Sequence, residues 1–163
     1  MFDPDVKIAV IWNWVKYNST YKYDITIGEA RQALLDTPAT RNDAGSFKKT
    51  MNSFEVDMKD NGEDGVYVKE DPTPEDHAKL LRDLKARFRN NPRKKHCILY
   101  CFAAHGGVSS GLQCLVHNEF DQRSRWYKLF RAEYFIRQMA TKFKNTYQVV
   151  FFAACRQVFD TPK

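Results

Sequence analysis

Continuous runs of apolar and β-favouring residues divide the chain and predict the strands of a sheet. The most prominent are Val6 to Trp14, the run from Cys97 that stops at His105, and Tyr147 to Ala154. Runs of this length between polar residues are typical of strands that are buried on both faces, as in a parallel sheet. We therefore expect a mainly parallel sheet that has these segments among its strands.

Apolar residues between these runs recur at helical spacing and predict three longer helices. The second has a clear start, because Thr73 is a capping residue, Pro74 suits the first helical position and acids follow. The predicted helices are Arg41 to Phe54, Thr73 to Asn90 and Arg125 to Phe143. Strands that alternate with helices in this way predict an α/β fold with helices on both faces of the sheet.

Three other segments receive less regular assignments. Thr26 and Glu29 have the spacing of a capping box, which predicts a short helix as far as Leu34. Residues 59–71 are rich in charge and glycine and are predicted to form a flexible loop. Gly106 to Asp121 is expected to be a loop with a small hairpin around Leu112 to Val116.

Length and composition are those of a soluble globular protein. The 163 residues are expected to form one domain, 1–163, with 43% hydrophobic and 28% charged residues. No apolar run approaches the roughly 20 residues that span a bilayer, and the first residues do not resemble a secretory signal. Four cysteines without disulfide-scaffold density favour a reducing intracellular compartment, most simply the cytoplasm.

The net charge of +6 raises the question of nucleic-acid binding. A basic cluster exists, but it lies mostly on the predicted helix that begins at Thr73, where a solvated outer face explains it. Interleaved aromatic residues and a known nucleic-acid module are both missing, so no nucleic-acid partner is predicted. The cluster comprises Arg82, Lys85, Arg87, Arg89, Arg93, Lys94 and Lys95.

Most histidines and cysteines have ordinary explanations. Cys97 and Cys101 share one face of a strand and are expected to be buried structural thiols. Cys114 and His117 would be a poor supply of further ligands, so neither a metal nor another cofactor is predicted. His77 and His96 are expected to lie on the surface, at a helix start and a strand start respectively.

His105 and Cys155 differ because each follows an apolar strand. In parallel sheets, reactive groups gather where strands finish at their carboxyl ends, so a thiol and an imidazole placed there form a candidate nucleophile–base pair. Gly106 and Gly107 follow the histidine and allow a sharp turn with free amides. The alternative is a buried cysteine and a strand-end histidine that share no role.

The same residues resemble the caspase, metacaspase and paracaspase superfamily. The histidine precedes the cysteine by 50 residues (155 − 105), and Ala154-Cys155-Arg156 is close to the caspase cysteine signature. Ala104-His105-Gly106 is similar to the G-H-G of the family, and Asn42-Asp43-Ala44 to the N-D-A that begins a metacaspase helix. The resemblance covers roughly residues 6–157 and implies a three-layer caspase-like sandwich.

By this resemblance the chain would be a cysteine endopeptidase that acts on polypeptides through an acyl-enzyme. Cys155 would be the nucleophile and His105 the proton shuttle, and the amides of Gly106 and Cys155 would form the oxyanion hole. Asp43 matches one acid of the metacaspase pocket for a basic side chain. A helix N-terminal acid that complements the dipole explains Asp43 equally well.

Two departures from the family pattern leave the activity open. Ala153 replaces the Asp of metacaspases or the Gln of caspases, and the chain stops six residues (158–163) after the cysteine motif, without small-subunit strands. The strand edge at 147–152 would then be uncovered, and we expect a small-subunit-like chain, a second copy or another protein to occupy it. The competing hypothesis is an inactive caspase-fold subunit that serves as a structural component of an assembly.

Overall fold

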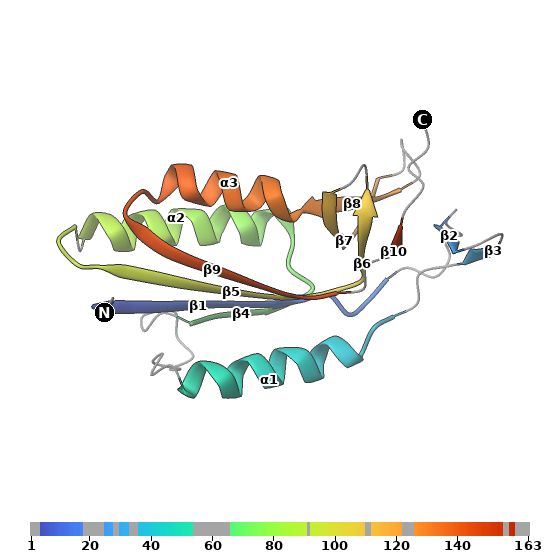
Figure 1. Ribbon diagram of the computed structural model, residues 1–163, viewed down its shortest axis with the longest axis horizontal. Coiled ribbons are helices and arrows are strands. Elements are labelled where there is room, and N and C mark those ends of the chain that lie inside the picture. The colour runs from blue at the N-terminus through green and yellow to red at the C-terminus, as the bar shows by residue number, and fades with distance from the viewer. Residues whose placement is uncertain are drawn as a thin grey trace.

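The main body of the protein is a parallel sheet between helices (Figure 1). The computed structural model describes residues 4–17, 25–27, 30–32, 36–53, 66–90, 92–109, 112–121, 126–154 and 157–158. The strand order is β4-β1-β5-β9, and each neighbouring pair is parallel. These strands are β1 (Val6–Asn13), β4 (Val66–Glu70), β5 (His96–Ala103) and β9 (Thr146–Ala153).

Helices cover both faces of this main sheet. Helix α1 (Ala39–Ser53) lies on one face, and α2 (Pro74–Asn90) and α3 (Ala132–Lys142) lie together on the other (Figure 1). The predicted α/β sandwich of three layers is therefore confirmed. Among the described residues, no helix combines the length and apolarity needed to cross a bilayer.

Helix α2 begins where its sequence predicts. The Thr73 amide donates to the Asp76 carboxylate at 2.8 Å, and the Asp76 amide donates back to the Thr73 hydroxyl at 3.2 Å. This reciprocal capping satisfies amides that the first helical turn leaves open. The hydrogen bond from the Thr73 backbone also lowers the pKa of Asp76. Leu80 and Leu84 then lie one turn apart on the buried face.

The larger core fills the space between the main sheet and the pair α2 and α3. Phe102 is fully buried, and its ring lies 5.3–6.2 Å from the rings of Trp12, Trp14, Tyr100, Phe130, Phe135 and Phe152. Aromatic side chains of this size bury the largest areas, so this cluster dominates the packing. Met139 and Phe143 of the α3 region complete it.

The core beneath α1 is smaller and aliphatic. The buried residues Ala44 and Met51 of α1, with Phe47 packed beside them, face the sheet at helical spacing, as their sequence pattern predicts. They meet small or medium side chains of β1 and β5, which are Ala9, Ile11, Cys97, Leu99 and Cys101. This helix crosses the two central strands only, and β9 contacts it little.

A second sheet occupies the region beyond β5 that the sequence predicted as a loop. Its strand order is β10-β6-β7-β8, with β6 antiparallel to β7 and β7 antiparallel to β8. The strands are β6 (Gly106–Ser109), β7 (Leu112–Asp121), β8 (Trp126–Arg131) and β10 (Gln157–Val158). Leu112 to Val116, around which a small hairpin was expected, instead lie within the single strand β7, which pairs with β6 and β8.

The predicted helix over residues 125–143 is wrong in its first third. Residues Trp126–Arg131 form β8, and α3 begins directly after it at Ala132. Leu129 and Ala132 are three residues apart, so the end of a strand imitated a helical stripe. The apolar stripe that predicted this helix continued through Ile136, Met139 and Phe143. Met139 and Phe143 are buried, but Ile136 is 44% exposed and Phe135, at 2%, is buried in its place.

Two further assignments are corrected by short strands. Instead of a helix that starts at Thr26, Ile25–Ile27 (β2) pairs antiparallel with Ala30–Gln32 (β3), consistent with the β-favouring sequence Ile-Thr-Ile. Within the predicted loop 59–71, Val66–Glu70 forms β4. This strand is too short to give a clear sequence pattern, and pairing with β1 stabilises it. Residues 59–65 lie outside the described part of the chain.

Candidate active site at the carboxyl end of the main sheet

Three strands of the main sheet finish side by side and are tied together by backbone hydrogen bonds. Ala103 at the end of β5 is in register with Ala153 at the end of β9. The Ala104 amide donates to the Ala153 carbonyl at 3.2 Å, and the Trp14 amide donates to the Ala103 carbonyl at 2.9 Å. Whatever follows β5 and β9 in the chain therefore starts from adjacent points on one edge.

His105 occupies the junction between the main sheet and the second sheet. It lies between β5 and β6, and its side chain is half-buried. Its carbonyl accepts a hydrogen bond of 2.8 Å from the Val116 amide of β7. The backbone of His105 is therefore held on both sides, by β5 behind it and by β7 across from it.

Tyr17 contacts the His105 imidazole and was not identified from the sequence. The two ring centroids are 4.9 Å apart at an interplanar angle of 61°, an edge-on arrangement. Tyr17 is 4% exposed, and its hydroxyl donates to the Val116 carbonyl at 2.8 Å. Tyr17 begins the polar and aromatic stretch Tyr17 to Tyr23, which the sequence predicts to be a loop, and nothing local distinguishes it from the tyrosines that follow.

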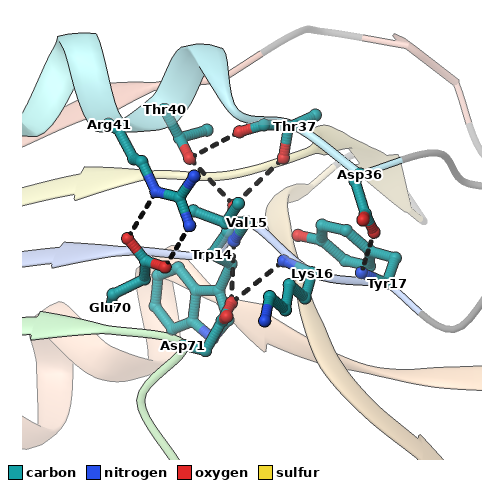
Figure 2. A network of polar contacts seen from close by, with 10 residues as sticks. All are labelled: Trp14, Val15, Lys16, Tyr17, Asp36, Thr37, Thr40, Arg41, Glu70 and Asp71. Carbon is teal, nitrogen blue, oxygen red and sulfur yellow. Dashed lines mark hydrogen bonds and ion pairs between the residues drawn. The ribbon is translucent and has the colours of Figure 1, made fainter.

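The segment that carries Tyr17 is fixed by carboxylates from two other parts of the chain (Figure 2). The Asp71 carboxylate accepts from the amides of Val15 at 2.7 Å and Lys16 at 3.2 Å. The Asp36 carboxylate accepts from the Tyr17 amide at 2.7 Å. Asp71 has a φ of 48°, a left-handed conformation that Asp tolerates better than most residues, and this conformation accompanies its two hydrogen bonds.

Threonines before and within α1 complete this network. The hydroxyls of Thr37 and Thr40 lie 3.0 Å and 3.1 Å from the Trp14 carbonyl. The Thr37 amide donates to the Val15 carbonyl at 2.8 Å. These bonds attach the start of α1 to the end of β1, so the helix begins at the same edge of the sheet as His105.

An exposed ion pair joins α1 to β4 at this edge. Arg41 binds Glu70 through two hydrogen bonds, of 2.8 Å from Nε and 2.6 Å from a terminal nitrogen (Figure 2). The hydrogen bonds from Arg41 lower the pKa of Glu70, and the same contact raises the pKa of Arg41. Such pairs contribute little stability in water, but the forked geometry orients both side chains.

Of the other predicted site residues, the structure describes Gly106 and Asp43 but not Cys155. Cys155 lies outside the described residues, directly after the half-buried Ala154. Gly106 is the first residue of β6, is buried, and lies opposite Leu115 of β7. Asp43 is half-buried on α1, which begins at Ala39, so it lies beyond the first helical turn where an acid interacts best with the dipole.

The remaining histidines are less exposed than expected. The side chain of His77 points from α2 toward the sheet, and its ring centroid lies 5.9 Å from that of Trp12 and 5.8 Å from that of Phe135. His96 is 5% exposed, and its ring centroid lies 4.3 Å from that of Phe88. Burial lowers the pKa of both imidazoles. The surface prediction was wrong for both, because each lies on the inner face of its element. His117 contacts Trp14 at 5.6 Å.

The prediction that Cys97 and Cys101 are buried structural thiols is confirmed for Cys101, whereas Cys97 is half-buried. Both pack against α1, and Cys101 is fully buried. Burial raises the pKa of Cys97 and raises that of Cys101 to about 11, so neither thiol ionises readily at neutral pH. These two cysteines therefore lack the thiolate character that a nucleophile needs.

The family of the chain follows from comparison with known sequences. The sequence model of the caspase domain, peptidase family C14, matches residues 7–162. The chain belongs to the caspase domain family. The match extends from the first strand of this caspase domain past both His105 and Cys155. The comparison with curated proteins returns no match.

Proposed function

We propose that this caspase domain is a cysteine endopeptidase in which His105 and Cys155 form the catalytic dyad. One observation carries the proposal, the pairing of Ala103 with Ala153 at the ends of two adjacent parallel strands. His105 and Cys155 each follow their paired alanine by two residues in the sequence. Neighbouring strands are about 4.8 Å apart, and two residues reach at most about 7 Å, so both side chains start within reach of one substrate carbonyl.

The proposed reaction is acyl transfer to a thiol. His105 takes the proton from the Cys155 thiol, and the thiolate attacks the carbonyl carbon of the substrate peptide bond. His105 then gives that proton to the leaving amine as the carbon–nitrogen bond breaks. Water, activated by the same imidazole, hydrolyses the thioester and restores the thiol. No metal or cofactor takes part.

The position of Gly106 supports its proposed role in the oxyanion hole. Because the His105 carbonyl accepts from the Val116 amide, His105 and Val116 form a hydrogen-bonded pair of the antiparallel ladder. Backbone groups alternate along such a ladder, so the Gly106 amide is directed away from β7. It thus faces the side of β6 on which β10 lies. With the amide of Cys155, it could stabilise a developing oxyanion.

We propose that Asp43 binds the substrate side chain next to the scissile bond. It lies three residues after Thr40, whose hydroxyl contacts Trp14 at the carboxyl edge. A half-buried carboxylate here favours a basic substrate residue, as in metacaspases. Ala153, which has no polar group, leaves Asp43 as the proposed acid of this pocket.

The open edge at β9 supports a partner chain. In the described sheet β9 is one of the two edge strands, and Tyr147, Val149 and Phe151 on its α1 side are 55%, 42% and 40% exposed. Residues 146–153 contain no charged side chain that would oppose pairing. We propose that a small-subunit-like chain, a second copy of this chain or another protein covers residues 147–152, which would make the protein an oligomer.

The same edge favours one alternative, an inactive caspase-fold subunit that joins an assembly through β9. Both proposals fit a reducing intracellular compartment. Cys97 and Cys101 are free thiols, which suits such a compartment.

Hydrolysis of a peptide library tests the proposal. The library carries basic, acidic or neutral residues before the cut, and the full chain is compared with Cys155→Ala, His105→Ala and the control Cys97→Ala. We expect the first two variants to lose at least about 1000-fold in rate and the control to keep its activity. Mild alkylation should label Cys155 before Cys97 or Cys101. Equal rates in wild type and Cys155→Ala would contradict the peptidase proposal and favour the inactive subunit.

A further inference from the structure

We propose that Tyr17 is a positioning residue that holds the His105 imidazole in its working orientation. The catalytic part of this inference rests on the proposed peptidase function. The contact itself does not, because it is a property of the fold. Tyr17 lies outside the predicted dyad, oxyanion hole and substrate pocket, and it acts on the site through its ring contact with His105.

The first step is the contact between the two rings. Tyr17 presents an edge-on ring at 4.9 Å from the His105 ring, within the range in which aromatic pairs have a preferred geometry. Rotation of the imidazole about its χ1 or χ2 bond would bring it into collision with this ring or remove it from contact. The buried tyrosine ring thus excludes some of the rotamers that a half-buried histidine could otherwise adopt.

The second step is that the tyrosine ring is fixed at its far end. Its hydroxyl donates to the Val116 carbonyl at 2.8 Å, and the Val116 amide donates to the His105 carbonyl at 2.8 Å. Tyr17, Val116 and His105 therefore form a closed cycle of one ring contact and two hydrogen bonds. The Tyr17 ring cannot move away from β7 without stretching its hydroxyl bond, and the His105 backbone is held to the same strand.

The third step is that the backbone beneath the ring is fixed as well. Tyr17 lies in a segment without regular secondary structure, yet successive amides of that segment are bound by the Asp71 and Asp36 carboxylates (Figure 2). Hydrogen bonds to charged groups are stronger than those between neutral groups. The segment that follows β1 is thereby fixed by hydrogen bonds, and it holds Tyr17 in a defined position beside His105.

Orientation matters here because a general base must lie within hydrogen-bond reach of the proton it takes. Many nucleophile–base pairs use a third group that orients the base. In this protein, the edge of a buried aromatic ring performs that role for His105. Displacement of a catalytic group by about 1 Å can reduce a rate by about 100-fold, so loss of the ring should act on turnover rather than on substrate binding.

The experiment compares Tyr17→Phe, which keeps the ring, with Tyr17→Leu, which removes it. Tyr134→Leu is the control, since Tyr134 is 63% exposed. The first measurement is the order of the His105 side chain by NMR relaxation, which requires no activity. The second is the separate determination of kcat and KM. We expect Tyr17→Leu to disorder the imidazole and to lower kcat about 30- to 100-fold at nearly constant KM, while Tyr17→Phe keeps kcat within about fivefold.

An ordered His105 ring in Tyr17→Leu, or an equal loss of kcat in Tyr17→Phe and Tyr17→Leu, would overturn the proposal. If Tyr17→Leu does not fold, Asp36→Ala replaces it with Asp36→Asn as its control, because Asn keeps an oxygen acceptor for the Tyr17 amide. Disorder at His105 is then expected in the alanine variant only, and its absence there would overturn the proposal. Absence of Cys155-dependent turnover in wild type contradicts the proposed function alone, since the NMR result still decides the role of Tyr17.

Discussion

The two faces of the main sheet are filled to different extents. The face beneath α2 and α3 is a continuous core of interlocked aromatic rings centred on Phe102. The face beneath α1 has a small aliphatic core over β1 and β5, and its outer strand β9 keeps an exposed apolar stripe. A single helix covers about two strands of a sheet, so the covering of α1 ends before β9.

This contrast separates two tasks within one sheet. The crowded face supplies the packing that fixes the positions of the strands. The sparse face retains apolar surface at the strand that leads to Cys155, where a monomer seldom leaves such a stripe without a use. Stability and association should therefore respond to different residues, even when these residues are neighbours in the sheet.

The largest expected effect comes from a pair of phenylalanines on adjacent strands. Phe102→Ala should lower the free energy of unfolding by about 3–5 kcal/mol, because it opens a cavity among six aromatic rings. Phe151→Ala, on the other face of β9, should cost about 1 kcal/mol or less, because that ring is already 40% exposed. Urea denaturation measures both. Similar losses in the two variants would show that the two faces are equally packed.

Acid is expected to lower the stability by a smaller amount. This effect sharpens the comparison, because the two histidines that cause it lie on the crowded face. His77 lies on α2 and His96 packs against Phe88 of α2, and each has a buried Nε2 without a hydrogen-bond partner among the described residues. Burial lowers the pKa of both, and the positive charge of Lys142 lowers that of His77 further. Below the usual histidine pKa of about 6.5, the unfolded chain therefore binds protons before the folded protein does, and stability falls.

Thermal unfolding between pH 7.5 and pH 5.5 measures this effect. We expect Tm to decrease by a few degrees in the wild type and by less in the double variant His77→Gln, His96→Gln. An unchanged pH dependence in the double variant would assign the acid sensitivity to other groups.

The smallest effect on stability is expected on the sparse face, where Val149→Lys replaces a residue that is 42% exposed. Its free energy of unfolding should change by no more than about 0.5 kcal/mol. A lysine on an edge strand nevertheless opposes strand pairing. Sedimentation velocity should show association in the wild type and a monomer in the variant. Identical sedimentation of the two proteins would contradict an interface at β9.

Strands β1, β5 and β9 of the main sheet and the three helices, apart from the start of α3, could be predicted because their signals are local, whereas β4 was assigned to a loop. The runs that became β1, β5 and β9 are long and apolar, and α2 has a cap, a proline and a buried stripe. The second sheet was missed because its strands β6 to β8 are mixed in polarity and are stabilised by one another. Cross-strand pairing of this kind joins residues whose individual sequences carry a weak pattern.

The candidate site divides in the same way. His105 and Cys155 follow strands, so position and spacing predicted them. Tyr17 could not be predicted, because its role depends on an edge-on contact with a residue far away in the sequence and on a hydrogen bond to Val116. Asp36 and Asp71 accept hydrogen bonds from backbone amides. The sequence does not distinguish a loop acid that accepts such bonds from one that does not.

The edge strand β9 is also the last of the four strands of the main sheet to be synthesised. β4, β1 and β5 can assemble on the ribosome while β6, β7, β8 and α3 are still being made, and closing the long loop between β5 and β9 has an entropic cost. In the proposed enzyme, the imidazole and the thiol remain on separate parts of the nascent chain until β9 docks. A partly translated chain would thus be folded over most of its length and still unable to cut its neighbours.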